Sequence, residues 1–201
     1  MKKKFIEIQD YIPDNLSFSD RKYNKSSIIY DENYKLFLKI KNANIASNLF
    51  LSNYSEYNKY FKLNLNKLSQ ESIVILEDIM NEIAEEFEPD EIVQRNLLFN
   101  SQYNSLSVRI PIKNDRLSCD IFDNNSNEIR ATTTNITDLL KKNSTVNVSL
   151  SLDEVSFFEK KCFIILKLYQ IRILSDGNVT MKKDDDDYYE SKHEITLLDD
   201  D

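Results

Sequence analysis

Basic and aromatic residues alternate on segments of this chain whose spacing predicts β-strands. Lys35, Lys39 and Lys41 fall on the same side of one such segment as Phe37. Cations of this kind contact phosphate groups, and flat rings stack on nucleic-acid bases. Any half-exposed sheet can show the same alternation, so an ordinary solvated surface stays open as an interpretation. The candidate set for nucleic-acid contacts is Lys35, Phe37, Lys39, Lys41, Arg109, Lys113, Arg116, Phe122, Arg130, Phe158, Lys160, Lys161, Lys167 and Tyr169.

Groups for catalysis or metal binding are scarce in the sequence. The single histidine, His193, lies in an acidic terminal segment, so no histidine-based triad or zinc cluster is predicted. One glycine cannot supply a glycine-rich phosphate loop. The segment 120–128 superficially resembles a calcium loop but lacks its glycine, which favours a turn. We therefore expect no enzyme, no cofactor and no metal site.

Negative charge is concentrated in two blocks. The chain has 26 Lys+Arg and 34 Asp+Glu, for a net charge of -8. Residues 184–201 contain nine acids and one base, so residues 1–183 carry 25 charges of each sign. A second block, residues 71–91, contains nine acids and no base, which leaves 16 acids against 25 bases elsewhere. The low isoelectric point therefore conceals a body with basic surface.

The length of 201 residues favours one folded domain, 1–179, followed by a disordered acidic tail, 180–201. No apolar run approaches membrane-spanning length, and the first residues lack the apolar stretch of a signal peptide. Cys119 and Cys162 are isolated in apolar runs and are expected to be buried, unpaired thiols. We expect an intracellular, reducing compartment and no membrane partner.

One helix is predicted at about 69–88. Apolar residues such as Leu76, Ile79 and Ile83 recur at helical spacing, and Pro89 ends the pattern. The helix carries the internal acidic block on its outer side. It is interpreted as a solvated amphipathic helix, with an acidic docking site as the alternative.

Alternation of period two predicts strands over much of the remaining chain. Segments in the first half, including 34–41 and 61–68, would extend a barrel or form a small subdomain. A short helix at 135–142 would separate the third and fourth strands of the second half, which is OB-fold connectivity. A Greek-key sandwich would show similar alternation. The five predicted strands of the second half are 105–113, 117–124, 128–134, 145–153 and 162–174.

The segments "NSLSVRIPIKNDRLSCDIFDNNSNEIRATTT" and "VNVSLSLDEVSFFEKKCFIILKLYQIRIL", followed by the acidic tail, carry a family resemblance. In architecture they resemble OB-fold single-stranded DNA-binding proteins of phages and nucleocytoplasmic large DNA viruses. The chain departs from that pattern because it has no Trp and ends in three aspartates instead of a terminal Phe. The resemblance implies single-stranded DNA binding without strong sequence preference. It also implies roles in DNA replication, recombination and repair at viral replication sites in the host cytoplasm or nucleus.

The tail is predicted to mimic a nucleic-acid strand. It would compete for the empty basic groove and, once released by DNA, recruit a polymerase, helicase or primase. A purely solvating tail is the alternative. The tail residues proposed to act are Asp184, Asp185, Asp186, Asp187, Tyr188, Tyr189, Glu190, Leu197, Leu198, Asp199, Asp200 and Asp201.

Two other function classes fit the same sequence. One is a viral structural or assembly protein that uses its acidic helix and tail to bind basic partners. The other is a binder of double-stranded DNA or RNA. The resemblance leaves a homo-oligomer open.

Overall fold

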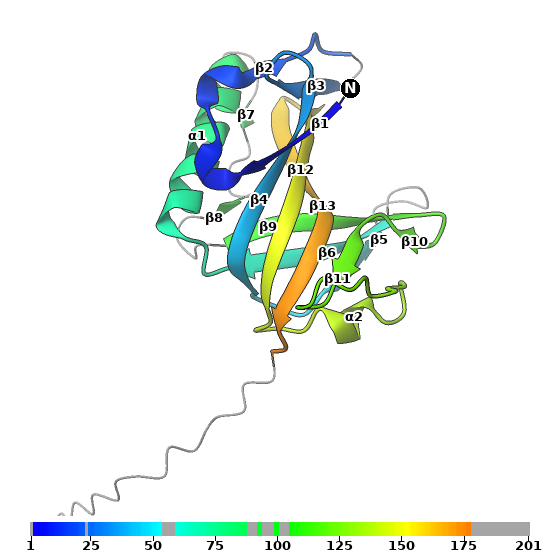
Figure 1. The fold of residues 1–201 in the computed structure, drawn as a ribbon. Coiled ribbons are helices and arrows are strands. Elements are labelled where there is room, and N and C mark those ends of the chain that lie inside the picture. The colour runs from blue at the N-terminus through cyan, green and yellow to red at the C-terminus, as the bar shows by residue number, and fades with distance from the viewer. Residues whose placement is uncertain are drawn as a thin grey trace, which may run out of the picture.

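The computed structural model describes most of the chain and shows a mainly β protein (Figure 1). The acidic tail proposed at 180–201 lies outside the described residues and stays a prediction. No helix among the described residues is long and apolar enough to cross a membrane. The described residues are 2–22, 24–53, 59–87, 92–93, 99–100 and 105–177.

Five strands pair in a ring. β4 pairs with β12, β12 with β13, β13 with β9, β9 with β6, and β6 again with β4. The β9–β13 pairing is parallel and the other four are antiparallel. This order is that of an OB-like barrel. The five strands are β4 (Tyr34–Ile45), β6 (Lys59–Asn66), β9 (Ser105–Lys113), β12 (Thr145–Phe158) and β13 (Lys161–Ser175).

Alternating side chains explain why these strands enclose a core. On β6, Leu63 and Leu65 are fully buried, whereas Lys62 between strands β5 and β9 is exposed. Side chains of a strand point alternately to its two faces, so the leucines face the barrel interior. Two of the strand pairings in the ring are short: β9 pairs with β13 at one residue pair, and β4 pairs with β6 at two. The barrel is therefore held mainly by its long β4–β12–β13 ladder.

Shorter elements surround the ring. β1 lies parallel to β4, and β5 continues the sheet beyond β6. β10 and β11 pair with β9 and β13 respectively. These elements are β1 (Lys2–Glu7), η1 (Ile8–Asp10), η2 (Pro13–Asn15), β2 (Leu16–Phe18), β3 (Lys25–Tyr30), β5 (Phe50–Asn53), β7 (Ile92–Val93), β8 (Phe99–Asn100), β10 (Arg116–Leu117) and β11 (Asp120–Phe122).

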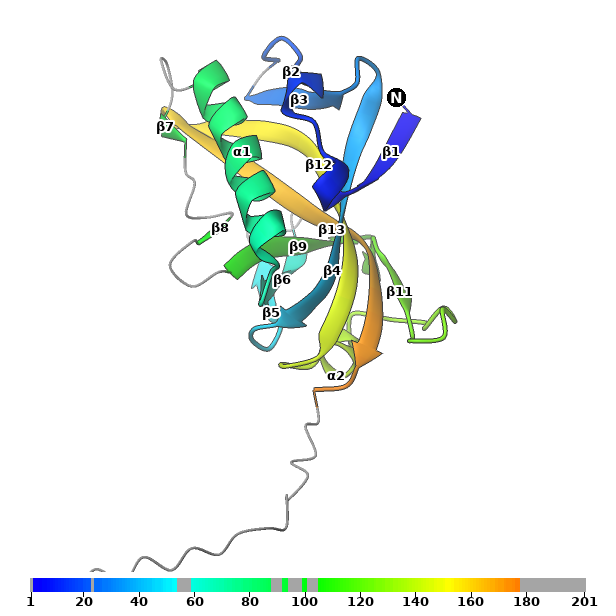
Figure 2. The same cartoon turned by 60° about the vertical axis from the view of Figure 1, so that its left-hand side comes forward.

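The long helix α1 (Gln70–Phe87) follows β6 and confirms the helix predicted at about 69–88. Figure 2 shows it running beside the barrel strands, and it contacts η1, η2 and β7. Its apolar side, including Leu76, Ile79 and Ile83, is buried. Pro89, which was expected to end the helix, lies outside the described residues.

The expected set of barrel strands was wrong in two places. The segment 117–124 forms only the short β10 and β11, and the segment 128–134 forms no strand beyond one bridge at Glu128. There the Asn135 side chain accepts hydrogen bonds from the backbone N–H and the hydroxyl of Thr132. These local bonds compete with strand pairing and turn the chain into α2 (Ile136–Leu139).

The first half of the chain supplies the two missing barrel strands, β4 and β6. The N-terminal region is thus part of the barrel, and the alternative of a separate subdomain is excluded by this pairing. The short helix α2 does lie between the third and fourth strands of the ring, β9 and β12, as expected.

Candidate nucleic-acid interface

A row of side chains crosses the outer face of four adjacent strands. Phe50 on β5 is paired with Lys62 on β6, Lys62 with Arg109 on β9, and Arg109 with Lys167 on β13. Directly paired residues have Cβ atoms about 5 Å apart, so these side chains are neighbours. We call Lys62, Arg109 and Lys167 the cationic row.

Aromatic side chains flank the cationic row. The guanidinium carbon of Arg109 lies 4.5 Å from the ring centroid of Tyr60, and the Phe50 side chain is 67% exposed. Beyond Tyr60, Lys113 and Arg116 form an exposed pair at the start of β10. Cations and rings are therefore interleaved over β5, β6 and β9.

Two of the three cations in the row have no acidic neighbour within the part of the chain that the structure describes. Among the described residues, neither Lys62 nor Arg109 has a carboxylate within the 4.0 Å of an ion pair. Lys167 differs, because its Nζ lies 3.6 Å from Asp153 and 3.8 Å from Glu154. Positive charge that no neighbouring acid offsets is available to an anionic ligand.

A cluster of three aromatic rings adjoins the row. Phe37 on β4 lies 4.7 Å from Phe5 on β1 and 4.8 Å from Tyr169 on β13, measured between ring centroids. Lys3 covers Tyr169, with its Nζ donating to the phenol oxygen at 2.9 Å. Ser151 on β12 is paired with both Phe37 and Lys167, which places the cluster beside the cationic row.

The cluster corrects one expectation about Phe37. Its ring was predicted to be open for stacking, but it is only 3% exposed because Phe5 and Tyr169 cover it. Phe5, at 39% exposure, presents the open edge of the cluster. Lys35, the neighbouring candidate on β4, is half-buried and paired with Lys3.

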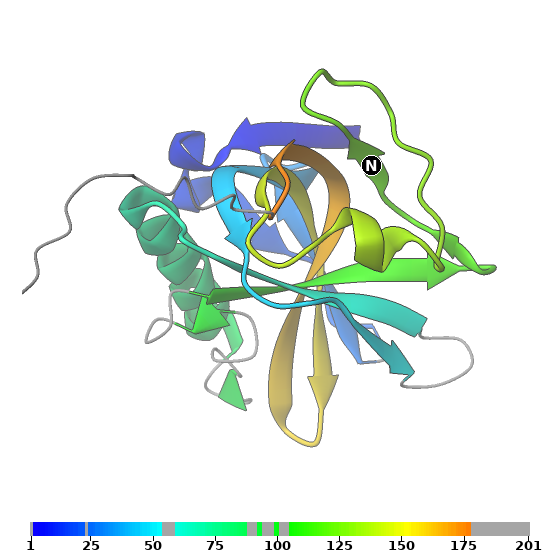
Figure 3. The same cartoon turned by 90° about the horizontal axis from the view of Figure 1, so that it is seen from below.

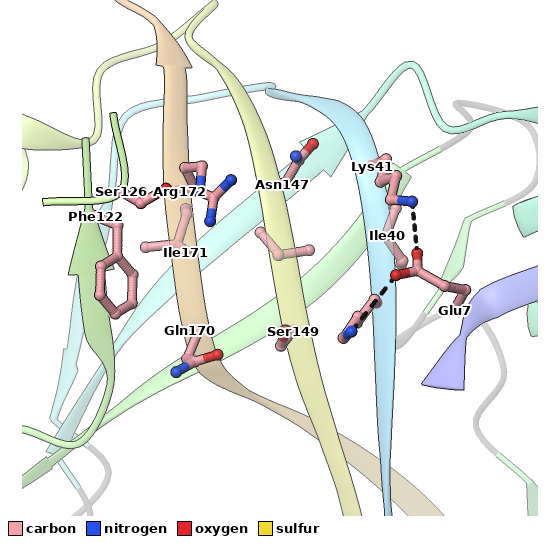
Figure 4. A pocket seen from close by; sticks show the side chains of 12 residues that line it. Glu7, Ile40, Lys41, Phe122, Ser126, Asn147, Ser149, Gln170, Ile171 and Arg172 are labelled. Carbon is pink, nitrogen blue, oxygen red and sulfur yellow. Dashed lines mark hydrogen bonds and ion pairs between the residues drawn. The ribbon is translucent and has the colours of Figure 1, made fainter. Parts of the chain in front are cut away.

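Three other candidates line a groove of about 420 Å³ on the outer face of β4, β12 and β13. In Figure 4, Glu7 on β1 forms one wall and Phe122 on β11 the other. The Glu7 carboxylate lies 3.0 Å from Lys41 Nζ and 3.5 Å from Lys39 Nζ. Arg172 on β13 also lines the groove.

The two lysines govern the ionisation of Glu7. Partial burial by itself would raise the pKa of this carboxyl group, but the contacts with Lys41 and Lys39 outweigh it and lower the pKa below its usual value. Glu7 is therefore ionised near neutral pH and offsets part of the charge of both lysines.

The hairpin that joins β12 to β13 holds Phe158, Lys160 and Lys161. Phe158 is 61% exposed, and the turn residues Glu159 and Lys160 both have positive φ. In Figure 3 the hairpin projects away from β6 and β9. Lys161 and Lys167 are six residues apart on β13, a separation of about 20 Å. The structure therefore does not bring these three candidates into the row.

Arg130 lies apart from the row as well. It is exposed in the irregular segment after β11, near Arg116, Asp120 and Glu128, which line the same surface hollow. The twelve tail residues lie outside the described residues.

Neither cysteine forms a disulfide, and Cys119 is half-buried where full burial was expected. Cys162 is buried, and burial with the nearby Asp120 raises the pKa of the Cys119 thiol to about 12. Both thiols therefore belong to the packing of the fold, and Cys119 stays protonated near neutral pH.

The sequence prediction missed Lys62, Tyr60, Phe50, Lys3 and Phe5. A signal existed for Lys62, because the alternation of residues 61–68 already places it outward from Phe61 and Leu63. Nothing local indicated that its strand lies next to Arg109, since that pairing joins residues far apart in the chain.

No protein-family model and no curated protein sequence matches this chain. Solved structures do. The single-stranded DNA-binding protein from bacteriophage Enc34, in complex with single-stranded DNA, aligns with a TM-score of 0.51 at 12% identity, over 80% of this chain and 96% of that one. The chain has the fold of this phage protein.

Two further structures align less well. A second structure of the Enc34 protein gives a TM-score of 0.47 at 12% identity, over 85% of this chain and 96% of that one. The single-stranded DNA-binding protein encoded by bacteriophage T7 gives a TM-score of 0.45 at 11% identity, over 73% of this chain and 97% of that one.

Proposed function

We propose that this protein binds single-stranded DNA without strong sequence preference. The observation that carries the proposal is the cationic row, with Phe50 and Tyr60 beside it, on the outer face of β6 and β9. This face, formed by the second and third strands, is where OB-fold barrels bind oligonucleotides.

The chemistry of the row suits a single strand. Lys62, Arg109 and Lys167 would contact phosphates, which every sequence shares. Phe50 and Tyr60 would stack on bases, and each stacked base contributes about 1–3 kcal/mol whatever its identity. A duplex keeps its bases stacked inside and cannot use the rings, which favours a single strand as ligand.

The fold of the Enc34 protein supports the same ligand, because that protein was solved with single-stranded DNA. We further infer a role in DNA replication, with related roles in recombination and repair, inside the cell at the sites where DNA is copied. The negative charge of residues 184–201 and their apolar Tyr188, Tyr189, Leu197 and Leu198 support a tail that competes with DNA and binds replication proteins.

The proposal is tested by fluorescence anisotropy of labelled oligo-dT and of a matched duplex over a range of salt concentrations. We expect the single strand to bind more tightly, with affinity that falls as salt rises. Arg109→Ala and Lys62→Ala should each reduce the salt slope by about 0.7, the contribution of one phosphate on a single strand. Tyr60→Ala should cost about 1–3 kcal/mol.

Lys22→Ala serves as the matched control, because Lys22 is exposed on the β2–β3 connection and outside the row. Its effect should be small. Equal binding of duplex and single strand would overturn the proposal and favour a general nucleic-acid binder. Absence of binding to either would favour the structural or assembly role.

A further inference from the structure

We propose that the groove between β1 and β11 is a second contact site for the same DNA strand, in which one nucleotide is held away from the cationic row. This inference rests on the proposed function. The groove lies on β4, β12 and β13, whereas the row lies on β6, β9 and β13. The strand β13 connects them.

The charge of the groove suits a phosphate group. Among the residues that line it, Lys39, Lys41 and Arg172 bring three positive charges against the carboxylate of Glu7. Asp123, which follows Phe122, interacts electrostatically with Arg172 and offsets part of its charge. The groove has a volume of about 420 Å³, which is large enough for one nucleotide. Phe122 closes the side opposite Glu7 and offers a ring to a base (Figure 4).

Polar side chains of the groove floor add hydrogen-bonding capacity. Asn147 Oδ1 accepts the backbone N–H of Asn42 at 2.9 Å, which fixes the amide so that its Nδ2 is available as a donor. Gln170 also lines the groove, where its Nε2 donates to Asp120 Oδ2 at 3.4 Å and keeps a second N–H as a donor. A nucleotide presents acceptors on its phosphate and sugar that match these donors.

Glu7 occupies the position that a phosphate would take. Its carboxylate lies between Lys41 and Lys39, at 3.0 and 3.5 Å, in the way that an anionic ligand would bridge the two ammonium groups. A phosphate entering the groove would compete with Glu7 for both lysines. Removing the negative charge of Glu7 should therefore strengthen binding, whereas removing Arg172 should weaken it.

The two sites are close enough for one strand. Lys167 of the row and Arg172 of the groove are five residues apart on β13, a separation of about 16 Å. Tyr169 lies between them on the same strand, with its hydroxyl held by Lys3. A DNA chain that leaves the row along β13 would thus pass the aromatic cluster before it reaches the groove.

The test compares two lengths of labelled oligo-dT. A strand of about 4 nucleotides, the lower end of OB-fold site sizes, fills the row alone, and one of about 16 nucleotides reaches the groove. Arg172→Ala should weaken binding of the long strand about eightfold at about 50 mM salt and lower its salt slope by about 0.7. The short strand should bind the Arg172→Ala variant with the same affinity as it binds the unmodified protein.

Glu7→Gln should change affinity in the opposite direction: it should strengthen binding of the long strand and leave binding of the short strand unchanged. Asp31→Asn is its matched control, because Asp31 pairs with Lys4 on the other face of β1 and the charge change is the same. Lys22→Ala is the control for Arg172→Ala. Thermal unfolding of each variant confirms that it is folded, and Arg172 is exposed, so its replacement leaves the core intact.

The outcomes separate the two proposals. If neither strand binds the unmodified protein, the proposed function fails. If the long strand binds, but Arg172→Ala and Glu7→Gln leave its affinity unchanged, the groove is not a nucleotide site. Both variants are also measured in protein lacking residues 184–201. Effects that disappear there would assign the groove to the acidic tail and overturn the nucleotide proposal.

Discussion

At the scale of single residues, Gly177 shows how tightly the end of β13 is packed. Its backbone N–H donates to Ser144 Oγ at 3.0 Å. A Cβ atom added at this position would lie 2.0 Å from the carbonyl oxygen of Lys142. That oxygen belongs to the backbone, so a larger residue could be accommodated only by moving the chain.

Gly177→Ala is therefore expected to destabilise the fold by about 1–3 kcal/mol, the usual cost of forcing extra atoms into a packed site. Urea unfolding measures this as a lower midpoint with an unchanged slope. Asp176→Ala, at the exposed neighbouring position, should leave the midpoint nearly unchanged. Equal midpoints for the two variants would show that the strand end is free to move.

Burial at the residue scale also separates binding surface from packing. Phe37 on the barrel strand β4 and Phe50 on β5 are both aromatic and both lie on outward positions, yet they are 3% and 67% exposed. The difference comes from neighbours, since β1 and β13 bring rings onto Phe37 whereas β5 is an edge strand. Of these two side chains, Phe50 is the one that presents a free ring to a ligand.

At the scale of elements, α1 begins with a side-chain cap. Ser69 Oγ accepts the backbone N–H of Ser72 at 3.1 Å, which satisfies one of the unpaired donors of the first turn. Glu71 in that turn suits the positive end of the helix dipole. In the chain, the helix lies between two barrel strands, β6 and β9.

Ser69→Ala is expected to lower the free energy of unfolding by about 1 kcal/mol, because the Ser72 N–H loses its acceptor. Ser69→Asp restores an acceptor oxygen and should keep most of the stability. Both are measured by thermal unfolding. If both variants lose the same amount of stability, the effect comes from packing around Ser69 and the cap hydrogen bond contributes nothing measurable.

At the scale of the whole molecule, charge is divided between the tail and the body. Residues 184–201 carry nine acids and one base, whereas the rest of the chain is neutral. That body places Lys62 and Arg109, which have no carboxylate partner among the described residues, on one face. An anionic segment tethered to a cationic face competes with any other anion for it. The strength of that competition depends on salt, because dissolved ions screen charges and the screening length falls to about 10 Å at 0.1 M.

Deleting residues 184–201 is therefore expected to raise the affinity for oligo-dT at low salt, with a difference that shrinks as salt rises. Anisotropy titrations of the full and shortened chains at several salt concentrations measure this. The shortened chain should also lose binding to replication proteins in pull-down assays. If the full and shortened chains give identical titration curves at low salt, the tail does not compete with DNA and the interpretation as a solvating tail is favoured.

The sequence by itself determined which side chains face outward and where the long helix lies. Period two in 105–113 separates Val108 from Arg109, and helical spacing defines α1 to within one residue at each end. The separation of acidic from basic segments is likewise a property of the sequence. These features are local, because backbone geometry fixes the direction of each side chain within an element.

Only the tertiary structure decided which strands are neighbours. Pairing of β4 and β6 with the second half completed the ring, and it placed Lys62 beside Arg109 and Phe50. The same folding buried Phe37 under Phe5 and set Glu7 between Lys39 and Lys41. Each of these contacts joins residues distant in sequence, and alternation within one strand contains no information about the strand that pairs with it.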